Sequence, residues 1–165
     1  MATIVTGGTG FVASNIVREL ASSGHEVVSI DIKDPDDMVR RYLEPGASNV
    51  TWVTADILDA DALARAVDGR DVTKIVHAAV YTAIRDDIEH DDSRRIVDIN
   101  VAGTANMLDL ARKIGVQRLL YVSSNSVYEG NDFANLLRED MAVQPRRLYG
   151  ISKYASELFA RRYGE

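Results

Sequence analysis

The sequence predicts an α/β fold, a doubly wound parallel sheet with helices on both faces. Three observations support this fold class. Short β-branched runs alternate with segments of helical periodicity from the first residues onward. A glycine-rich turn joins the first of these runs to the first helix. Strands that are separated by helices pair in parallel through right-handed crossovers, which gives a doubly wound sheet.

Each element has its own signal. Apolar runs of four to eight residues, rich in valine, isoleucine and threonine, predict strands. They lie at 3–6, 26–31, 49–56, 74–80 and 118–124. Apolar residues at helical spacing, with a capping residue before them or a glycine after them, predict helices. These lie at 13–20, 59–68 and 93–113, and from 145–149 to the end. Loops are expected at 33–37, 43–48 and 129–145, and no segment resembles an interdomain linker, so 1–165 is predicted to be one domain.

The composition excludes several classes of function. The net charge of −6 disfavours nucleic acid and anionic membranes as partners, because both attract basic surfaces. The sequence has no cysteine, so it can form no disulfide, thiolate nucleophile or cysteine zinc site, and with three scattered histidines we predict no metal. We find neither a signal peptide nor a membrane span, and expect a cytoplasmic protein.

The glycine-rich turn has the spacing of a dinucleotide-binding loop. In TGGTGFVAS, Gly7 permits a tight turn and Gly10 lets the backbone approach a pyrophosphate at the helix N-terminus. Ala13 takes the third position, where a small residue is needed for the helix to lie close to the sheet. A plain turn between strand and helix is the alternative interpretation.

Two acidic residues end neighbouring strands. Asp31 follows Gly10 by 21 residues, where a carboxylate accepts hydrogen bonds from an adenosine ribose and repels a 2′-phosphate. We therefore predict NAD rather than NADP as the cofactor, although Lys33 weakens this preference. Asp56 could accept from the adenine amino group or cap the following helix, a role for which Asp59 competes.

Tyr149 and Lys153 are four residues apart and therefore share one face of the last predicted helix. An ammonium beside a phenol favours the phenolate, which can serve as a general base when a nicotinamide oxidises an alcohol. Such a pair is also common on protein surfaces. The serines 123, 124 and 126, at the end of the fifth strand, could hold a substrate oxygen or serve turn formation.

These segments together resemble the extended short-chain dehydrogenase/reductase superfamily, the NAD-dependent epimerase/dehydratase family. The matching pieces are TGGTGFVA, SID, ADI, VHAA, INVAGT, YVSSNSVY and YGISK, in the order of the family. The resemblance implies a Rossmann-type fold and a catalytic set of Ser124, Tyr149, Lys153 and Asn100. The cofactor-binding residues that it implies are Gly7, Thr9, Gly10, Phe11, Val12, Asp31, Ile32, Asp56, Ile57, Ala78, Ala79, Val80, Asn100, Tyr149 and Lys153.

The same resemblance implies a sugar or nucleotide-sugar substrate and a homodimer formed by the 93–113 and 146–163 helices. A dehydratase usually carries an acidic pair beside the serine, whereas this chain has Asn125 and Ser126, so a 4-epimerase fits better. A simple sugar dehydrogenase, a carbonyl reductase and an NAD-binding module without turnover stay open. Family members are about twice as long, so we expect the sheet to be truncated before its last strands and a C-terminal substrate domain to be absent.

Overall fold

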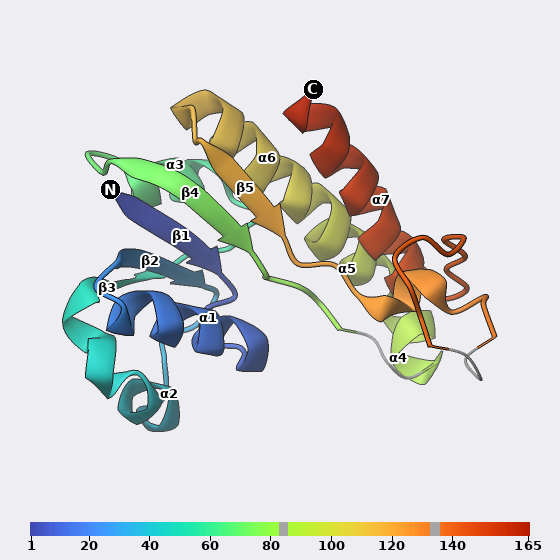
Figure 1. Ribbon diagram of the computed structural model, residues 1–165, viewed down its shortest axis with the longest axis horizontal. Coiled ribbons are helices and arrows are strands. Elements are labelled where there is room, and N and C mark those ends of the chain that lie inside the picture. The colour runs from blue at the N-terminus through green and yellow to red at the C-terminus, as the bar shows by residue number, and fades with distance from the viewer. Residues whose placement is uncertain (83–85, 133–135) are drawn as a thin grey trace. The chain divides into compact units, whose positions relative to one another are not determined.

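The computed structural model describes residues 1–82, 86–132 and 136–165 (Figure 1). Residues 133–135 of the predicted loop at 129–145 lie outside the described residues. The chain forms two compact units. The first comprises residues 1–80 and 106–122, and the second comprises residues 81–105 and 123–165.

The first unit contains a five-stranded sheet in which every strand pair is parallel. Its strands are β1 (Ala2–Thr6), β2 (Glu26–Asp31), β3 (Val50–Thr54), β4 (Val72–His77) and β5 (Arg118–Tyr121). The order β3-β2-β1-β4-β5 reverses direction between β1 and β4, so the predicted doubly wound fold is confirmed. The β3, β4 and β5 strands end earlier than predicted, which leaves polar and small residues in the turns at their carboxyl ends.

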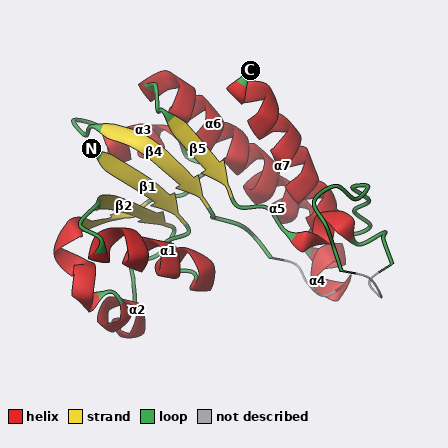
Figure 2. Cartoon of the chain, viewed as in Figure 1, coloured by secondary structure: helices red, strands yellow, loops and turns green. Residues whose placement is uncertain are grey.

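Helices cover both faces of this sheet (Figures 1 and 2). The helix α1 (Phe11–Ser22) packs Ala13, Val17 and Ala21 against Val5 and Val27 of the strands. The opposite face carries α3 (Ala60–Val67) and the part of α6 (Gly103–Ile114) that belongs to this unit. Alternation along β1 places Ile4 on that opposite face, and it is fully buried.

Two short helices follow β2, in a region where the sequence predicts mainly loop. Asp36 caps α2 (Asp37–Tyr42) by accepting a hydrogen bond from the amide of Val39. The loop predicted at 43–48 is instead a 3₁₀ helix (Glu44–Asn49), and that prediction is wrong. Gly46 lies so close to α1 that a Cβ on it would come within 2.7 Å of the Cβ of Ala21. Tertiary packing of this glycine, rather than local propensity, explains the difference.

The second unit is helical. It contains α4 (Asp86–Asp91), α5 (Ser93–Val97), a π-helical segment (Asp98–Ala102), the first turn of α6, a 3₁₀ helix (Asn125–Tyr128) and α7 (Leu148–Gly164). The long helix predicted over 93–113 is confirmed as an unbroken helical run from Ser93 to Ile114, although the sequence did not predict the π-helical turn within it. The start of the last helix is confirmed at Leu148. The helix α7 packs against α5, the π-helical segment and the 3₁₀ helix.

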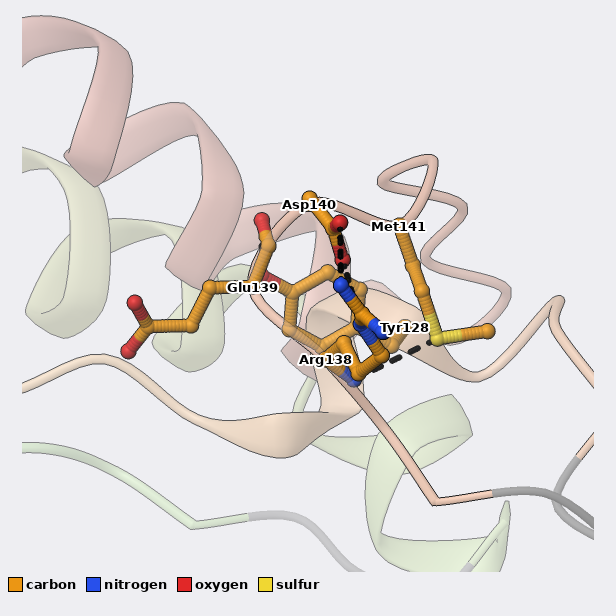
Figure 3. A network of polar contacts seen from close by, with 5 residues as sticks. All are labelled: Tyr128, Arg138, Glu139, Asp140 and Met141. Carbon is orange, nitrogen blue, oxygen red and sulfur yellow. Dashed lines mark hydrogen bonds and ion pairs between the residues drawn. The ribbon is translucent and has the colours of Figure 1, made fainter.

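A surface network orders the segment that precedes α7 (Figure 3). Arg138 donates two hydrogen bonds to the Asp140 carboxylate, at 3.0 and 2.8 Å, and its amide lies 3.3 Å from the sulfur of Met141. The Tyr128 hydroxyl reaches the carbonyl of Glu139 at 3.5 Å. Because Arg138 and Asp140 are exposed, this network contributes little to stability.

Candidate functional site

The glycine loop between β1 and α1 is built from backbone hydrogen bonds. The amide of Gly7 donates to the carbonyl of Ile30 at 2.8 Å, and the amide of Gly10 donates to the carbonyl of Gly7 at 2.8 Å. Gly7 has a φ of 71°, a left-handed conformation that favours glycine. Gly10 caps α1 without a side-chain hydrogen bond, so the first amides of the helix have no side-chain cap.

The loop lies too close to the strands for side chains. A Cβ on Gly7 would lie 2.9 Å from the Cα of Ala79, and a Cβ on Gly8 would lie 1.9 Å from the Oγ of Ser29. Gly8 is a functional candidate that the sequence prediction missed, although it is the second glycine of the TGGTG motif. A bare backbone turn at a helix N-terminus fits the pyrophosphate of a dinucleotide.

Asp31 contacts this loop directly. Its Oδ2 accepts hydrogen bonds from the amide of Thr9 at 3.0 Å and from the hydroxyl of Thr9 at 2.7 Å. A carboxylate has room for further donors, because its two oxygens offer about four acceptor sites. The structure thus brings Asp31 and Thr9 together at the end of β2, where a carboxylate is suited to accepting hydrogen bonds from an adenosine ribose.

A buried threonine joins the ends of β1 and β4. The Oγ1 of Thr6 accepts from the amides of Ala78 and Ala79, each at 3.1 Å, and lies 2.7 Å from Nδ1 of His77. Because Thr6 already accepts from two amides, its own hydroxyl hydrogen is available to the nearby Nδ1 of His77. Thr6 and His77 fix the Ala78–Ala79 backbone, and the sequence prediction gave neither a role. A polar residue directly after the apolar pair of each strand was the available signal.

The other predicted cofactor residues of this unit differ in exposure. Phe11, Val12, Ile32, Asp56 and Val80 are exposed and Ile57 is buried. The Oδ1 of Asp56 accepts from the amide of Leu58 at 2.9 Å, which stabilises a turn. Asp59 caps α3 through the amide of Ala62, so the capping alternative for Asp56 is wrong.

The predicted catalytic set belongs entirely to the second unit. Tyr149 and Lys153 lie on α7 at i and i+4, so they share a face of that helix. Tyr149 is half-buried, whereas Lys153 is only 3% exposed. Burial lowers the pKa of Lys153 from its ordinary value of 10.5 to about 8, and the charge of Glu157 acts in the opposite direction. A buried ammonium that still carries charge at neutral pH is suited to stabilising a phenolate.

The side chain of Asn100 is buried in this unit and makes three hydrogen bonds. Its Oδ1 accepts from the amide of Tyr81 at 2.8 Å, while its Nδ2 donates to the carbonyl of Tyr81 at 3.1 Å and to the Oγ of Ser152 at 3.0 Å. Ser152 in turn donates to the carbonyl of Tyr149 at 2.7 Å. Asn100, which is 2% exposed, thereby links the 81–82 segment to the turn of α7 between Tyr149 and Lys153.

The π-helical segment gives the backbone of Asn100 a second role. Its carbonyl accepts hydrogen bonds from the hydroxyls of Thr104 at 2.6 Å and Ser156 at 2.7 Å. In a regular α-helix this carbonyl would pair with the amide four residues later, whereas a π-helical turn shifts that pairing. Two hydroxyls therefore tie the segment to itself and to α7.

The serines after β5 have separate partners. The Oγ of Ser124 accepts from the amide of Ser126 at 3.2 Å and caps the 3₁₀ helix. The hydroxyl of Ser123 donates to the carboxylate of Glu157. The turn-forming alternative therefore describes part of what Ser124 does, and its half-buried hydroxyl can still donate.

With this geometry in place, the class of protein follows from comparison with known families. Residues 3–165 match the model of the NAD dependent epimerase/dehydratase family. The chain belongs to this family, whose cofactor is NAD, and the resemblance seen in the sequence motifs is confirmed. The bare glycine loop and the Asp31 carboxylate are suited to holding this cofactor.

Particular relatives differ in what they act on. The chain is 33% identical, over 97% of its length, to a protein of Rhizobium meliloti named "Probable UDP-glucuronate 4-epimerase". It is 40% identical, over 77% of its length, to a 3 beta-hydroxysteroid dehydrogenase/Delta 5-->4-isomerase of Mycobacterium tuberculosis. Its fold matches the UDP-glucose 4-epimerase of Thermus thermophilus, in complex with NAD, with a TM-score of 0.86 and 26% identity over 99% of this chain.

The chain spans 48% of the Rhizobium protein, 32% of the Mycobacterium protein and 51% of the Thermus structure. It thus corresponds to about half the length of the two epimerases and a third of the steroid dehydrogenase. Within the part of the chain that the structure describes, no helix is both long and apolar enough to cross a membrane. The cytoplasmic location predicted from the sequence stays a prediction.

Proposed function

We propose that this chain is the cofactor-binding and catalytic part of an enzyme that oxidises a hydroxyl of a nucleotide sugar by hydride transfer to NAD, with 4-epimerisation as the overall reaction. The observation that carries this proposal is the face of α7 that holds Tyr149 beside the buried Lys153. The names of the Rhizobium and Thermus relatives supply the substrate class.

Each residue of the catalytic set has a defined task in this proposal. The Tyr149 phenolate removes the proton from the substrate hydroxyl, and the Lys153 ammonium stabilises that phenolate. The Ser124 hydroxyl donates to the substrate oxygen, and Asn100 holds the turn of α7 through Ser152. When bound, NAD accepts the hydride from the oxidised carbon. In an epimerase the hydride then returns to the opposite face of the keto sugar, and Tyr149 gives back the proton.

A steroid alcohol dehydrogenase is the second candidate, because the Mycobacterium relative shares 40% identity with this chain. The same tyrosine and lysine would oxidise a secondary alcohol in either case. The two candidates differ in the fate of the hydride. A dehydrogenase releases NADH, which absorbs light at a wavelength where NAD does not, whereas an epimerase regenerates NAD in every cycle.

A homodimer is the proposed assembly, formed by the 93–113 and 146–163 helices. The second unit exposes apolar side chains on these helices, as the proposal requires. They are Val97 on α5 and Ile151, Leu158, Phe159 and Tyr163 on α7. A second copy of the chain would bury them in a bundle of four helices.

The test is turnover by the longest polypeptide that the gene encodes. Interconversion of UDP-glucose and UDP-galactose, or of the corresponding glucuronates, is followed by chromatography, and NADH formation from a 3β-hydroxysteroid is followed by absorbance. We expect Tyr149→Phe to reduce turnover by about 10²- to 10⁴-fold, because it removes the general base. Calorimetric titration should show unchanged NAD binding.

The matched control is Tyr154→Phe, which removes a phenol from the same helix outside the predicted catalytic set. Unchanged turnover in Tyr149→Phe would remove the proposed mechanism. NAD binding without turnover on any of these substrates would instead favour the binding module, the alternative that the sequence left open.

A further inference from the structure

We propose that Glu157 is a positioning residue of the catalytic helix: anchored by the hydroxyl of Ser123, its carboxylate stands one turn beyond Lys153 as the counter-charge of that buried ammonium. This inference rests on the proposed function, in which a charged Lys153 supports Tyr149. Neither the sequence motifs nor the predicted site contained Glu157.

The geometry of α7 supports this role. Tyr149, Lys153 and Glu157 follow one another at intervals of four residues, so the three side chains share one helix face. The Glu157 side chain is 20% exposed, far less than that of Glu165 at the end of the same helix, which is 66% exposed. A carboxylate in such a partly buried position interacts with a neighbouring ammonium more strongly than one in water.

The Ser123 contact fixes where this carboxylate stands. The Ser123 hydroxyl donates to Oε1 of Glu157, and Arg161 lies 3.9 Å from Oε2 on the exposed side. Ser123 immediately precedes Ser124, so the contact also ties the strand end that carries the proposed substrate-binding hydroxyl to α7. Glu157 thereby joins the segment that carries Ser124 to the helix that carries Tyr149 and Lys153.

Other charged groups on the elements packed against α7 have partners elsewhere. Arg94 pairs with Asp98 at 2.8 Å, Arg95 lies over the Tyr81 ring at 4.6 Å, and Asp92 accepts from the Tyr81 hydroxyl. The Tyr128 hydroxyl reaches the carbonyl of Glu139. Glu157, which also faces Arg161 on its exposed side, is the charge that raises the pKa of Lys153 against the effect of burial.

The experiment follows the titration of Lys153 itself. The sequence has lysines at 33, 74, 113 and 153, so lysine labelled with ¹³C at Cε gives few NMR signals, and Lys153→Met identifies the one required. We expect Glu157→Gln to move the midpoint of the Lys153 titration down by about one pH unit, since it removes the opposing charge. The alkaline limb of the pH–rate profile should move in the same direction.

The control is Glu165→Gln, which makes the same chemical change at an exposed site on the same helix and should leave the Lys153 midpoint unchanged. If Glu157→Gln does not fold, Glu157→Asp replaces it. Its shorter side chain draws the carboxylate back, so the Lys153 midpoint should fall below that of the wild type. An unchanged Lys153 midpoint in the folded Glu157 variant, or an equal change in Glu165→Gln, would overturn the proposal. Since the titration needs no substrate, absence of turnover would count against the proposed function and leave the result for Glu157 intact.

Discussion

The glycine loop and the helix α7, which are the proposed cofactor-binding and catalytic elements, are built from different parts of the chain. In the first unit the backbone makes the site, and side chains are excluded: Gly7 and Gly8 lie against Ala79 and Ser29 with no room for a Cβ. In the second unit side chains make the site, and the backbone adapts to them through a π-helical segment around Asn100. The proposed cofactor site is thus limited by volume, and the proposed catalytic site by hydrogen bonds and charge.

Among the proposed variants, Asn100→Asp in the second unit should have the largest effect on stability. The substitution keeps the shape but removes both Nδ2 donors, and it places a carboxylate against the carbonyl of Tyr81 in a site that is 2% exposed. We expect the free energy of unfolding to fall by about 4 kcal/mol, because a buried charge without a counter-charge is costly. Urea denaturation measures it.

The matched control for this substitution lies in the first unit. Asn106 is half-buried and donates a hydrogen bond to the carbonyl of Ile57 at 2.9 Å. Asn106→Asp should cost about 1 kcal/mol, the value of a typical hydrogen bond. An equal loss of unfolding free energy in the two variants would contradict the proposed difference between the two units.

Lys153→Met should stabilise the protein while abolishing turnover. The pKa of Lys153 falls from 10.5 to about 8 on folding, so the folded protein binds this proton less tightly than the unfolded chain does. The cost is fully present below pH 8, where it amounts to about 3 kcal/mol, and it disappears as the pH rises from 8 to 10.5. The gain in unfolding free energy of the variant should therefore be constant below pH 8 and vanish near pH 10.5.

Urea denaturation over this pH range measures the difference between the variant and the wild type. Lys113→Met, at an exposed position of α6, is the control and should show no such pH dependence. A Lys153→Met protein that is less stable than the wild type at pH 7 would show that the ammonium is better compensated than its burial indicates.

Gly8→Ala should have the smallest effect on stability and a specific effect on the cofactor. The added methyl would lie 1.9 Å from Oγ and 3.2 Å from Cβ of Ser29, so either the loop or the strand must shift. We expect a loss of about 2 kcal/mol, typical of overpacking, and weaker NAD binding by calorimetry.

The double variant Gly8→Ala, Ser29→Gly lacks the Ser29 side chain that the added methyl would meet. It should recover part of the NAD affinity, which would show that steric overlap causes the loss. The control is Gly164→Ala, where no atom lies within 4 Å of the added Cβ. Failure of the double variant to recover any affinity would show that Gly8 acts through backbone conformation instead.

The distance along the chain over which a signal acts explains what the sequence could predict. The sheet, α1 and the residues Gly7, Gly10 and Asp31 follow from local signals, namely periodicity, glycine spacing and a strand-end acid. The π-helical segment has no such signal, because its hydroxyl contacts join Asn100 to Ser156, which is 56 residues away. The Thr6–His77 pair and the Ser123–Glu157 contact depend likewise on residues that only the fold brings together.

The π-helical segment also constrains how this chain tolerates changes in length. A π-helical turn holds one residue more than the α-helical turn it replaces. Deletion of a single residue between 98 and 102 would let a regular α-helical turn form, and the carbonyl of Asn100 would then pair with a backbone amide instead of the hydroxyls of Thr104 and Ser156. The extra residue thus frees the Asn100 carbonyl for the two hydroxyls, and a chain one residue shorter here would lose the link between this segment and α7.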